Sequence, residues 1–335
     1  GTLIGTPPNA LLAAFMLENY GVEIGFLEWM KVGVPLLVVS VPLLYFVLTR
    51  WIYPIRITEI PGGKKLITKE LDQLGVMSNQ EKKVGFLFVL AALLWIFRPA
   101  LAPYVPGLSD AGIAIAIGVS LFLVPAGKQR MAVDENLDKM DSDTSNNSNS
   151  KDVSTGEDEQ GGNFEGILEW KDAQHLPWGI LLLFGGGLSM ASAISSTGLA
   201  EWIGSGISGL QNWPIILLVI IMITLMVFLT EMTSNTASTA TFLPILASIA
   251  IGLGENPLLF AIPTVLAASC AFMLPVATPP NAIVYGSGRI TIPEMSKAGL
   301  LLNLFFIALL SIGALTFFGL VFGIEVGVLP VWANL

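Results

Sequence analysis

The sequence is poor in charge, histidine and cysteine. Only 12% of its 335 residues are Asp, Glu, Lys or Arg, and it contains one histidine and one cysteine. The single cysteine, Cys270, excludes a framework of internal disulfides, and we expect it to be a small buried apolar residue. The sequence also lacks a metal-ligand cluster, a phosphate-binding glycine loop and a nucleophile–base pair. We therefore expect no enzyme.

Apolar residues are abundant instead. They make up 53% of the chain, and the mean hydropathy is +0.74. Uncharged stretches such as 34–48, 178–199 and 300–322 approach the ~20 residues that a helix needs to cross a ~30 Å hydrocarbon core. The composition predicts an all-α polytopic membrane protein.

The tetrapeptide Thr-Pro-Pro-Asn occurs twice, at 6–9 and at 278–281, each time in a hydrophobic stretch that leads to a long apolar segment. Proline interrupts a helix because it lacks an N–H and clashes with the preceding turn. Broken helices at corresponding positions of two repeats are a sequence pointer to the binding site of a secondary transporter. We predict two repeats with breaks at 5–9 and 275–281. Because the chain starts inside the first broken helix, we expect it to be the C-terminal part of a longer protein.

The chain is predicted to have three parts. Residues 1–55 end the first repeat, residues 56–176 hold two spans with cytoplasmic loops, and residues 177–335 form the second repeat. Twelve of the 25 acidic residues lie between Asp134 and Asp172, so the net charge of −9 is largely local. The segment 133–162 has few apolar residues to bury and is predicted to be disordered.

The predicted spans outside the broken helices are 34–51, 84–97, 111–124, 178–194 and 300–321. Residues 26–31, with Trp29 at headgroup depth, and residues 199–210 are predicted to be interfacial. All Lys and Arg except Lys31 and Arg98, 14 of the 16, fall on one face of this topology. By the positive-inside rule that face is cytoplasmic, and the C-terminus is extracytoplasmic.

A polar run at Thr230–Thr239 lies between two apolar arms, 213–229 and 241–253. Polar backbone at membrane depth is tolerated only where protein or a water-filled cavity surrounds it, so the pattern suggests a re-entrant hairpin. Two full spans with an external polar loop remain the alternative. An isolated Ser or Thr in an apolar helix usually bonds back to its own chain. Seven Ser, Thr or Asn within ten residues favour a binding site instead.

Carbonyl and hydroxyl oxygens at this tip suit a hard cation such as Na⁺, and nearby helix N-termini suit an anion. Between 213 and 288 the only charged residues are Glu231 and Glu255. An anion bound here would therefore need bound cations to balance its charge, which gives a physical reason for coupled binding. Glu231 either helps to hold a cation or accepts hydrogen bonds from backbone N–H groups, and the sequence leaves both roles open.

Three segments together, 177–187, 230–238 and 268–281, resemble the divalent anion:sodium symporter family, the INDY-type di- and tricarboxylate transporters. The resemblance covers nearly the whole chain apart from the acidic segment. It implies a homodimer of inverted repeats, with a scaffold and a moving transport domain in each protomer. We expect the protein to reside in a bacterial inner membrane. We expect lipid, Na⁺ and a dicarboxylate as partners, and no nucleic acid.

The resemblance also implies ligands. The backbone carbonyls of Thr230, Thr233 and Ala277 and the side chain of Asn235 would bind one Na⁺, and Gly5 would line a second Na⁺ site. The substrate would meet Ser234, Asn235, Thr236, Thr278, Pro279, Thr6 and Pro7. The first hairpin of the family pattern is absent from the sequence, so we expect that this length of chain alone does not transport.

The function implied is Na⁺-coupled import of a C4-dicarboxylate such as succinate by elevator-type alternating access. Dicarboxylate exchange and a sulfate-type oxyanion substrate remain open, because helix N-termini recognise charge more than carbon skeleton. A cation/proton antiporter of similar architecture would need a titratable group in the site, and Glu231 is the candidate.

Overall fold

The computed structural model describes residues 1–54, 63–126, 166–175, 178–199, 202 and 213–333. In this part of the chain the regular elements are helices, with one isolated bridge between Pro125 and Gly166. The all-α prediction is therefore confirmed. The acidic segment 133–162 and most of the predicted interfacial segment 199–210 lie outside the described residues.

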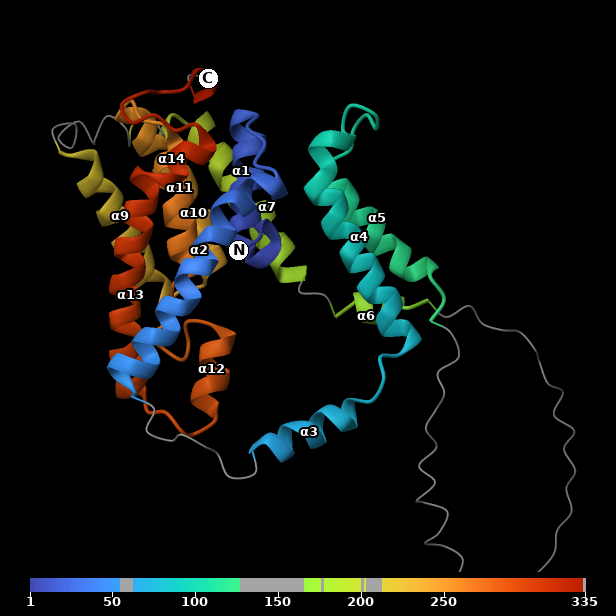
Figure 1. Cartoon of the computed structure of the whole chain (residues 1–335). Helices are drawn as coiled ribbons and strands as arrows, with labels where there is room; N and C mark the ends of the chain where they lie inside the picture. The colour runs from blue at the N-terminus through green and yellow to red at the C-terminus, as the bar shows by residue number, and fades with distance from the viewer. Residues whose placement is uncertain (55–62, 127–165, 176–177, 200–201, 203–212, 334–335) are drawn as a thin grey trace, which may run out of the picture. The chain divides into compact units, whose positions relative to one another are not determined.

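The chain forms two compact units, one made of residues 1–61 and 177–335 and the other of residues 62–176. The elements of the first unit (Figure 1) are η1 (Leu3–Gly5), α1 (Pro7–Tyr20), α2 (Phe26–Phe46), the π-helical η2 (Val47–Ile52), α7 (Trp178–Ser196), α9 (Ile215–Thr230), α10 (Asn235–Gly252), α11 (Pro257–Ala268), α12 (Pro279–Gly286), α13 (Ile292–Leu315), α14 (Phe317–Phe322) and η4 (Val331–Ala333). Those of the second unit are α3 (Gly63–Leu74), α4 (Asn79–Leu101), α5 (Asp110–Leu123) and α6 (Trp170–Ala173).

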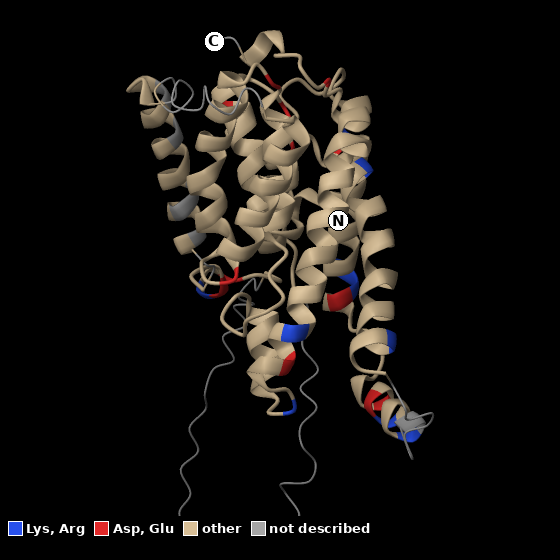
Figure 2. Cartoon of the chain, turned by 90° about the vertical axis from the view of Figure 1, so that its left-hand side faces the viewer, with Lys and Arg blue, Asp and Glu red and all other residues tan. Residues whose placement is uncertain are grey.

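Four of the described helical stretches are long and apolar enough to cross a membrane. They are α2 continued by η2, α4, α10 and α13, while α5, α9 and α11 are shorter apolar helices. Figure 2 shows that Lys, Arg, Asp and Glu lie mostly near the ends of the helices. Because charge is costly in hydrocarbon, this distribution fits helices embedded in a bilayer.

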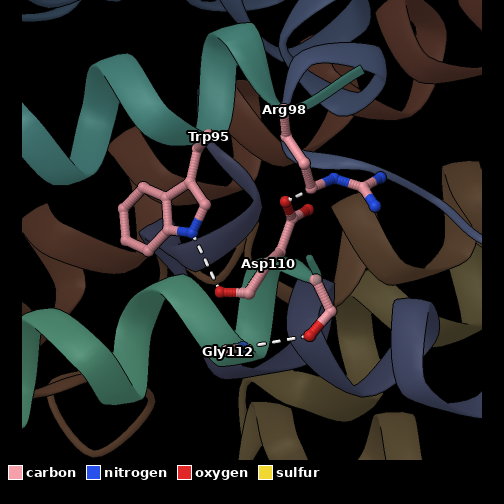
Figure 3. Close-up of polar contacts among 5 residues, drawn as sticks. Trp95, Arg98, Asp110 and Gly112 are labelled. Carbon is pink, nitrogen blue, oxygen red and sulfur yellow. Dashed lines mark hydrogen bonds and ion pairs between the residues drawn. The ribbon is translucent and has the colours of Figure 1, made fainter. Parts of the chain in front are cut away.

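In the second unit, polar contacts close the turn between α4 and α5 (Figure 3). The Trp95 indole N–H donates to the backbone carbonyl of Asp110 at 3.0 Å, and the Arg98 Nε lies 2.8 Å from the Asp110 carboxylate. Ser109 Oγ accepts from the Gly112 N–H at 3.1 Å and so caps the start of α5. Arg98, which the sequence leaves on the less basic face, is thus paired.

In the first unit, α11 is the central helix. Almost all of its side chains are buried, and it packs against α9, α10 and α13. A close approach joins α7 to α10, because a Cβ on Gly187 would lie 2.8 Å from the Ala240 Cβ. A Cβ on Gly185 or Gly186 would meet nothing within 4 Å. Of these three consecutive glycines, only Gly187 closely approaches another helix.

Two predicted boundaries were wrong. Residues 26–31 are the first turns of α2 rather than a separate segment, and Trp29 is fully buried in the protein. That this end of α2 lies at headgroup depth stays a prediction. The second break covers 269–278, because α11 already ends at Ala268. The prolines begin helices, since α1 starts at Pro7 and α12 at Pro279. Proline suits this position because the first N–H groups of a helix have no partner within it.

Candidate functional site at the hairpin tip and the breaks

The two Thr-Pro-Pro-Asn copies have the same local structure. Thr6 has φ −144° and ψ 147°, and Thr278 has φ −145° and ψ 152°. In both copies the asparagine amide donates to the carbonyl seven residues earlier, Asn9 to Thr2 and Asn281 to Leu274, each at 3.1 Å. The sequence repeat is therefore also a repeat of backbone geometry.

The two threonine hydroxyls have different partners. Thr278 Oγ1 accepts from the Asn281 N–H at 3.3 Å and caps α12. Thr6 Oγ1 lies 3.3 Å from the hydroxyl of Ser269, the residue that follows α11. The first break thus contacts the beginning of the second.

Only part of the polar run Thr230–Thr239 is unwound, since α9 ends at Thr230 and α10 begins at Asn235. The tip itself is residues 231–234, and α10 begins at Asn235, capped by Ser234 Oγ, which accepts from the Ala237 N–H at 3.4 Å. Thr233 Oγ1 donates to the Leu229 carbonyl, and Thr239 Oγ1 to the Asn235 carbonyl, both at 2.8 Å. These two hydroxyls bond back to their own segment, as Ser and Thr in apolar helices commonly do.

Thr230 joins the tip to the second break. Its Oγ1 lies 2.9 Å from the Ala268 carbonyl and 2.5 Å from the Asn235 side-chain oxygen, and the residue is fully buried. A hydroxyl has one proton and can donate to only one of these oxygens. Both contacts are satisfied when the Asn235 amide turns its NH₂ toward Thr230, because amide O and N are assigned from the surrounding network.

The predicted ligands therefore fall into two groups. Thr230, Asn235 and Thr6 converge on the end of α11, at Ala268–Ser269. The other predicted residues are bonded within their own segments or carry no side-chain hydrogen bond; they are Gly5, Pro7, Thr233, Ser234, Thr236, Ala277, Thr278 and Pro279. In Figure 1, α12, which begins at Pro279, lies below the main group of helices.

Glu231 is buried, and its carboxylate accepts hydrogen bonds from the backbone of the second break. The N–H groups of Phe272, Met273 and Leu274 lie 2.8–3.1 Å from its oxygens, and the Asn303 amide donates to Oε1 at 2.8 Å. Of the two roles left open by the sequence, this geometry is that of the acceptor for backbone N–H groups.

Sequence reasoning missed the side chains that hold the second break. Asn281 donates to the carbonyls of Ala271 and Leu274, and Ser296 donates to that of Met273 at 3.2 Å. Asn303 is fully buried in the apolar α13. A lone amide in an apolar helix and the asparagine of a repeated tetrapeptide were both visible signals.

The junction offers neutral oxygen ligands. Among the described residues there is no group of three or more His, Cys, Asp or Glu that could hold a metal. Carbonyl, hydroxyl and amide oxygens suit hard cations such as alkali-metal ions rather than transition metals. The N-terminus of α10 adds backbone N–H groups that favour an anion. Helix α12 begins with Pro279 and Pro280, which have no N–H, so it contributes mainly the positive end of its dipole.

Apolar helices interrupted within the bundle, with neutral polar atoms meeting at the interruption, are typical of secondary transporters. The profile of the family described as "Sodium:sulfate symporter transmembrane region" matches residues 1–324. The chain belongs to this family of divalent anion:sodium symporters, whose members are transporters and not enzymes.

Its curated relatives include the "Sodium-dependent dicarboxylate transporter SdcS" of Staphylococcus aureus strains USA300 and NCTC 8325 / PS 47. Each is 40% identical over 307 residues, which cover 91% of this chain and 53% of the relative. The chain thus spans about half the length of the curated relatives it matches.

Proposed function

We propose that the protein containing this chain imports C4-dicarboxylates such as succinate together with Na⁺. The observation that carries the proposal is the junction of Thr230, Asn235 and the Ala268 carbonyl, where uncharged hydroxyl, amide and carbonyl groups meet at the ends of three helices. Such a cluster can replace part of the hydration shell of Na⁺, and the relatives named for sodium-dependent dicarboxylate transport support the substrates.

The carried-over ligands belong to the same proposal. Thr230, Thr233, Asn235 and Ala277 would bind Na⁺, and Gly5 would line a second Na⁺ site. The dicarboxylate would meet the N-termini of α10 and α12, where the N–H groups of α10 and the positive ends of both helix dipoles favour its charge. Its contacts would be Ser234, Asn235, Thr236, Thr278 and Pro279, with Thr6 and Pro7 from the first repeat.

Coupling follows from charge. A dicarboxylate brings two negative charges to a place where the sequence supplies no Lys, Arg or His between 213 and 288. Bound Na⁺ would offset that charge, so the anion binds well only after the cation. We include in the proposal the elevator movement, a homodimer of inverted repeats with a re-entrant hairpin, and residence in a bacterial inner membrane.

The test is uptake of radiolabelled succinate into proteoliposomes that hold the complete protein, with and without an inward Na⁺ gradient. We expect uptake to need Na⁺ and to be lost in Asn235→Ala. Thr241→Ala is the matched control, because Thr241 lies on the same helix and its hydroxyl bonds to the Ala237 carbonyl of that helix. Uptake that ignores Na⁺ but needs internal dicarboxylate would identify an exchanger, and uptake of sulfate alone would change the substrate.

A further inference from the structure

Glu231 is a buried carboxylate whose partners are uncharged. Glu231 is 3% exposed. Within the described part of the chain its carboxylate accepts hydrogen bonds from three backbone N–H groups and one side-chain amide, and it forms no ion pair. A charge in an apolar interior is costly, so it persists only where it is well hydrogen-bonded or has a function.

Those contacts occupy the acceptor positions of the Glu231 carboxylate. Oε1 accepts from Phe272, Met273 and Asn303, and Oε2 accepts from Met273 and Leu274. An ionised carboxylate offers about four acceptor positions, so this one has none left for a cation. Glu231 therefore holds protein groups in place and does not bind an ion directly.

The groups that it holds are the unwound backbone of the second break. Since α11 ends at Ala268, the N–H groups of 272–274 have no helical partners, and Glu231 supplies the acceptors. Asn281 and Ser296 hold the carbonyls of the same segment from the other side. The break is thus a fixed structure rather than a loose connection.

Glu231 also follows Thr230, which contacts Asn235 and the Ala268 carbonyl. Thr230, the last residue of α9, and Glu231, the first residue of the tip, therefore together fix the spacing between the tip and the second break. We propose that Glu231 is the positioning residue of the Na⁺ site at the tip: it sets the distance between the oxygens of α9–α10 and those of the break without touching the ion. This inference rests on the proposed Na⁺-coupled function.

Asn303 makes a sharp test possible. Its side-chain oxygen is buried without a hydrogen-bond partner, while its NH₂ donates to Glu231. In Glu231→Gln the Asn303 amide can turn and accept from the new NH₂, so the pair is kept. What is lost is one acceptor oxygen for the break, together with the charge. The variant therefore removes the anchor with little change of shape.

The experiment measures succinate uptake by the complete protein as a function of Na⁺ concentration. We expect Glu231→Gln to raise the Na⁺ concentration for half-maximal uptake about tenfold or more, as loss of groups that orient metal ligands commonly does. The maximal rate at saturating Na⁺ and the KM for succinate measured there should change less. Glu231→Asp, which keeps the charge but is shorter, should lie between.

Glu255→Gln is the matched control, because Glu255 is also buried but, among the described residues, accepts a hydrogen bond only from the Gly327 N–H. We expect its Na⁺ dependence to equal that of the unmodified protein. The double variant Glu231→Gln/Asn303→Asp returns a carboxylate to the cluster but not the acceptor for the break. Recovery of Na⁺ affinity in that variant would mean that charge, not position, is what Glu231 supplies, and would overturn the inference.

If Glu231→Gln does not fold, Asn303→Ala tests the same inference. It removes one donor to the Glu231 Oε1 and leaves the backbone N–H groups of the second break in place. We expect a smaller rise in the half-maximal Na⁺ concentration, and no rise would overturn the inference. Na⁺-independent uptake by the unmodified protein would contradict the proposed function and the inference with it. Na⁺-dependent uptake with unchanged variants would contradict the inference alone.

Discussion

At the scale of single residues, the most consequential feature is the hydroxyl of Thr230. It is the only contact given by a side chain to the Ala268 carbonyl among the described hydrogen bonds, and that carbonyl lies at the end of α11 where helical partners run out. The hydroxyl also touches Asn235. One small side chain thus links three helix ends.

We expect Thr230→Val, which keeps the shape but removes the hydroxyl, to destabilise the complete protein by about 1–3 kcal/mol, the cost of a buried carbonyl without a partner. Thr239→Val is the matched control. Thr239 is equally buried, but its hydroxyl bonds to Asn235 of its own helix, where the carbonyl keeps its helical partner. Thermal unfolding in detergent measures both, and equal shifts would contradict the assignment.

Residue types were easier to predict than their partners. The repeated Thr-Pro-Pro-Asn drew attention to Thr6, which does contact the second break, and the polar run contained Thr230 and Asn235. The role of Glu231 could not be derived, because its acceptor function depends on backbone some forty residues later that unwinds at Ala268. Sequence pattern does not encode which buried carboxylate meets which freed N–H.

At the scale of elements, the apolar stretches predicted helices well, and the ends of those helices less well. The arm 213–229 corresponds to α9 (Ile215–Thr230), and the span 178–194 to α7 (Trp178–Ser196). The second break was placed too late, because proline was taken as the point of interruption. Proline instead begins α12, and the unwinding upstream is stabilised by side chains from other elements.

The packing of α13 against the second break depends on Gly299. A Cβ there would lie 2.3 Å from the Phe272 carbonyl oxygen and 2.5 Å from the Met273 Cα, and backbone cannot move aside as a flexible side chain can. We expect Gly299→Ala to displace α13 or the break, to cost about 1–3 kcal/mol or more, and to abolish Na⁺-dependent uptake.

Gly286→Ala is the control for that variant, because a Cβ at Gly286, the last residue of α12, would meet nothing within 4 Å. Uptake and thermal unfolding of the two variants are compared in the complete protein. Normal Na⁺-dependent uptake by Gly299→Ala would mean that the break tolerates displacement, and it would weaken the idea that its position matters.

At the scale of the whole molecule, composition alone was enough to predict a helical membrane protein, and the family match over residues 1–324 confirms the class. The division into three parts, with the end of the first repeat at 1–55, two spans and their loops at 56–176 and the second repeat at 177–335, stays a prediction. Helix contacts group residues 1–61 with 177–335, so segments that are far apart in the chain build one unit around α11. Such long-range grouping follows from which buried faces fit together, which periodicity does not specify.

The orientation in the membrane is the prediction that belongs to this scale. Because 14 of the 16 Lys and Arg fall on one predicted face, that face should be cytoplasmic and the C-terminus extracytoplasmic. Cys270, the one cysteine of this sequence, is buried, and Cys270→Ala together with replacement of any cysteine elsewhere in the complete protein gives a background without thiols. Val331→Cys tests the C-terminal region, and Gln73→Cys tests α3; both residues are exposed.

We expect a membrane-impermeant maleimide to label Val331→Cys in intact cells and Gln73→Cys only after the cells are permeabilised. The reverse pattern would invert the topology and place the basic loops outside. Labelling of both positions in intact cells would mean that α3 and the C-terminal region share a face, which an odd number of crossings between them forbids. In that case at least one segment taken as a full span does not cross the membrane. The hairpin would not be the cause, because a re-entrant hairpin and two full spans both leave the number of crossings odd.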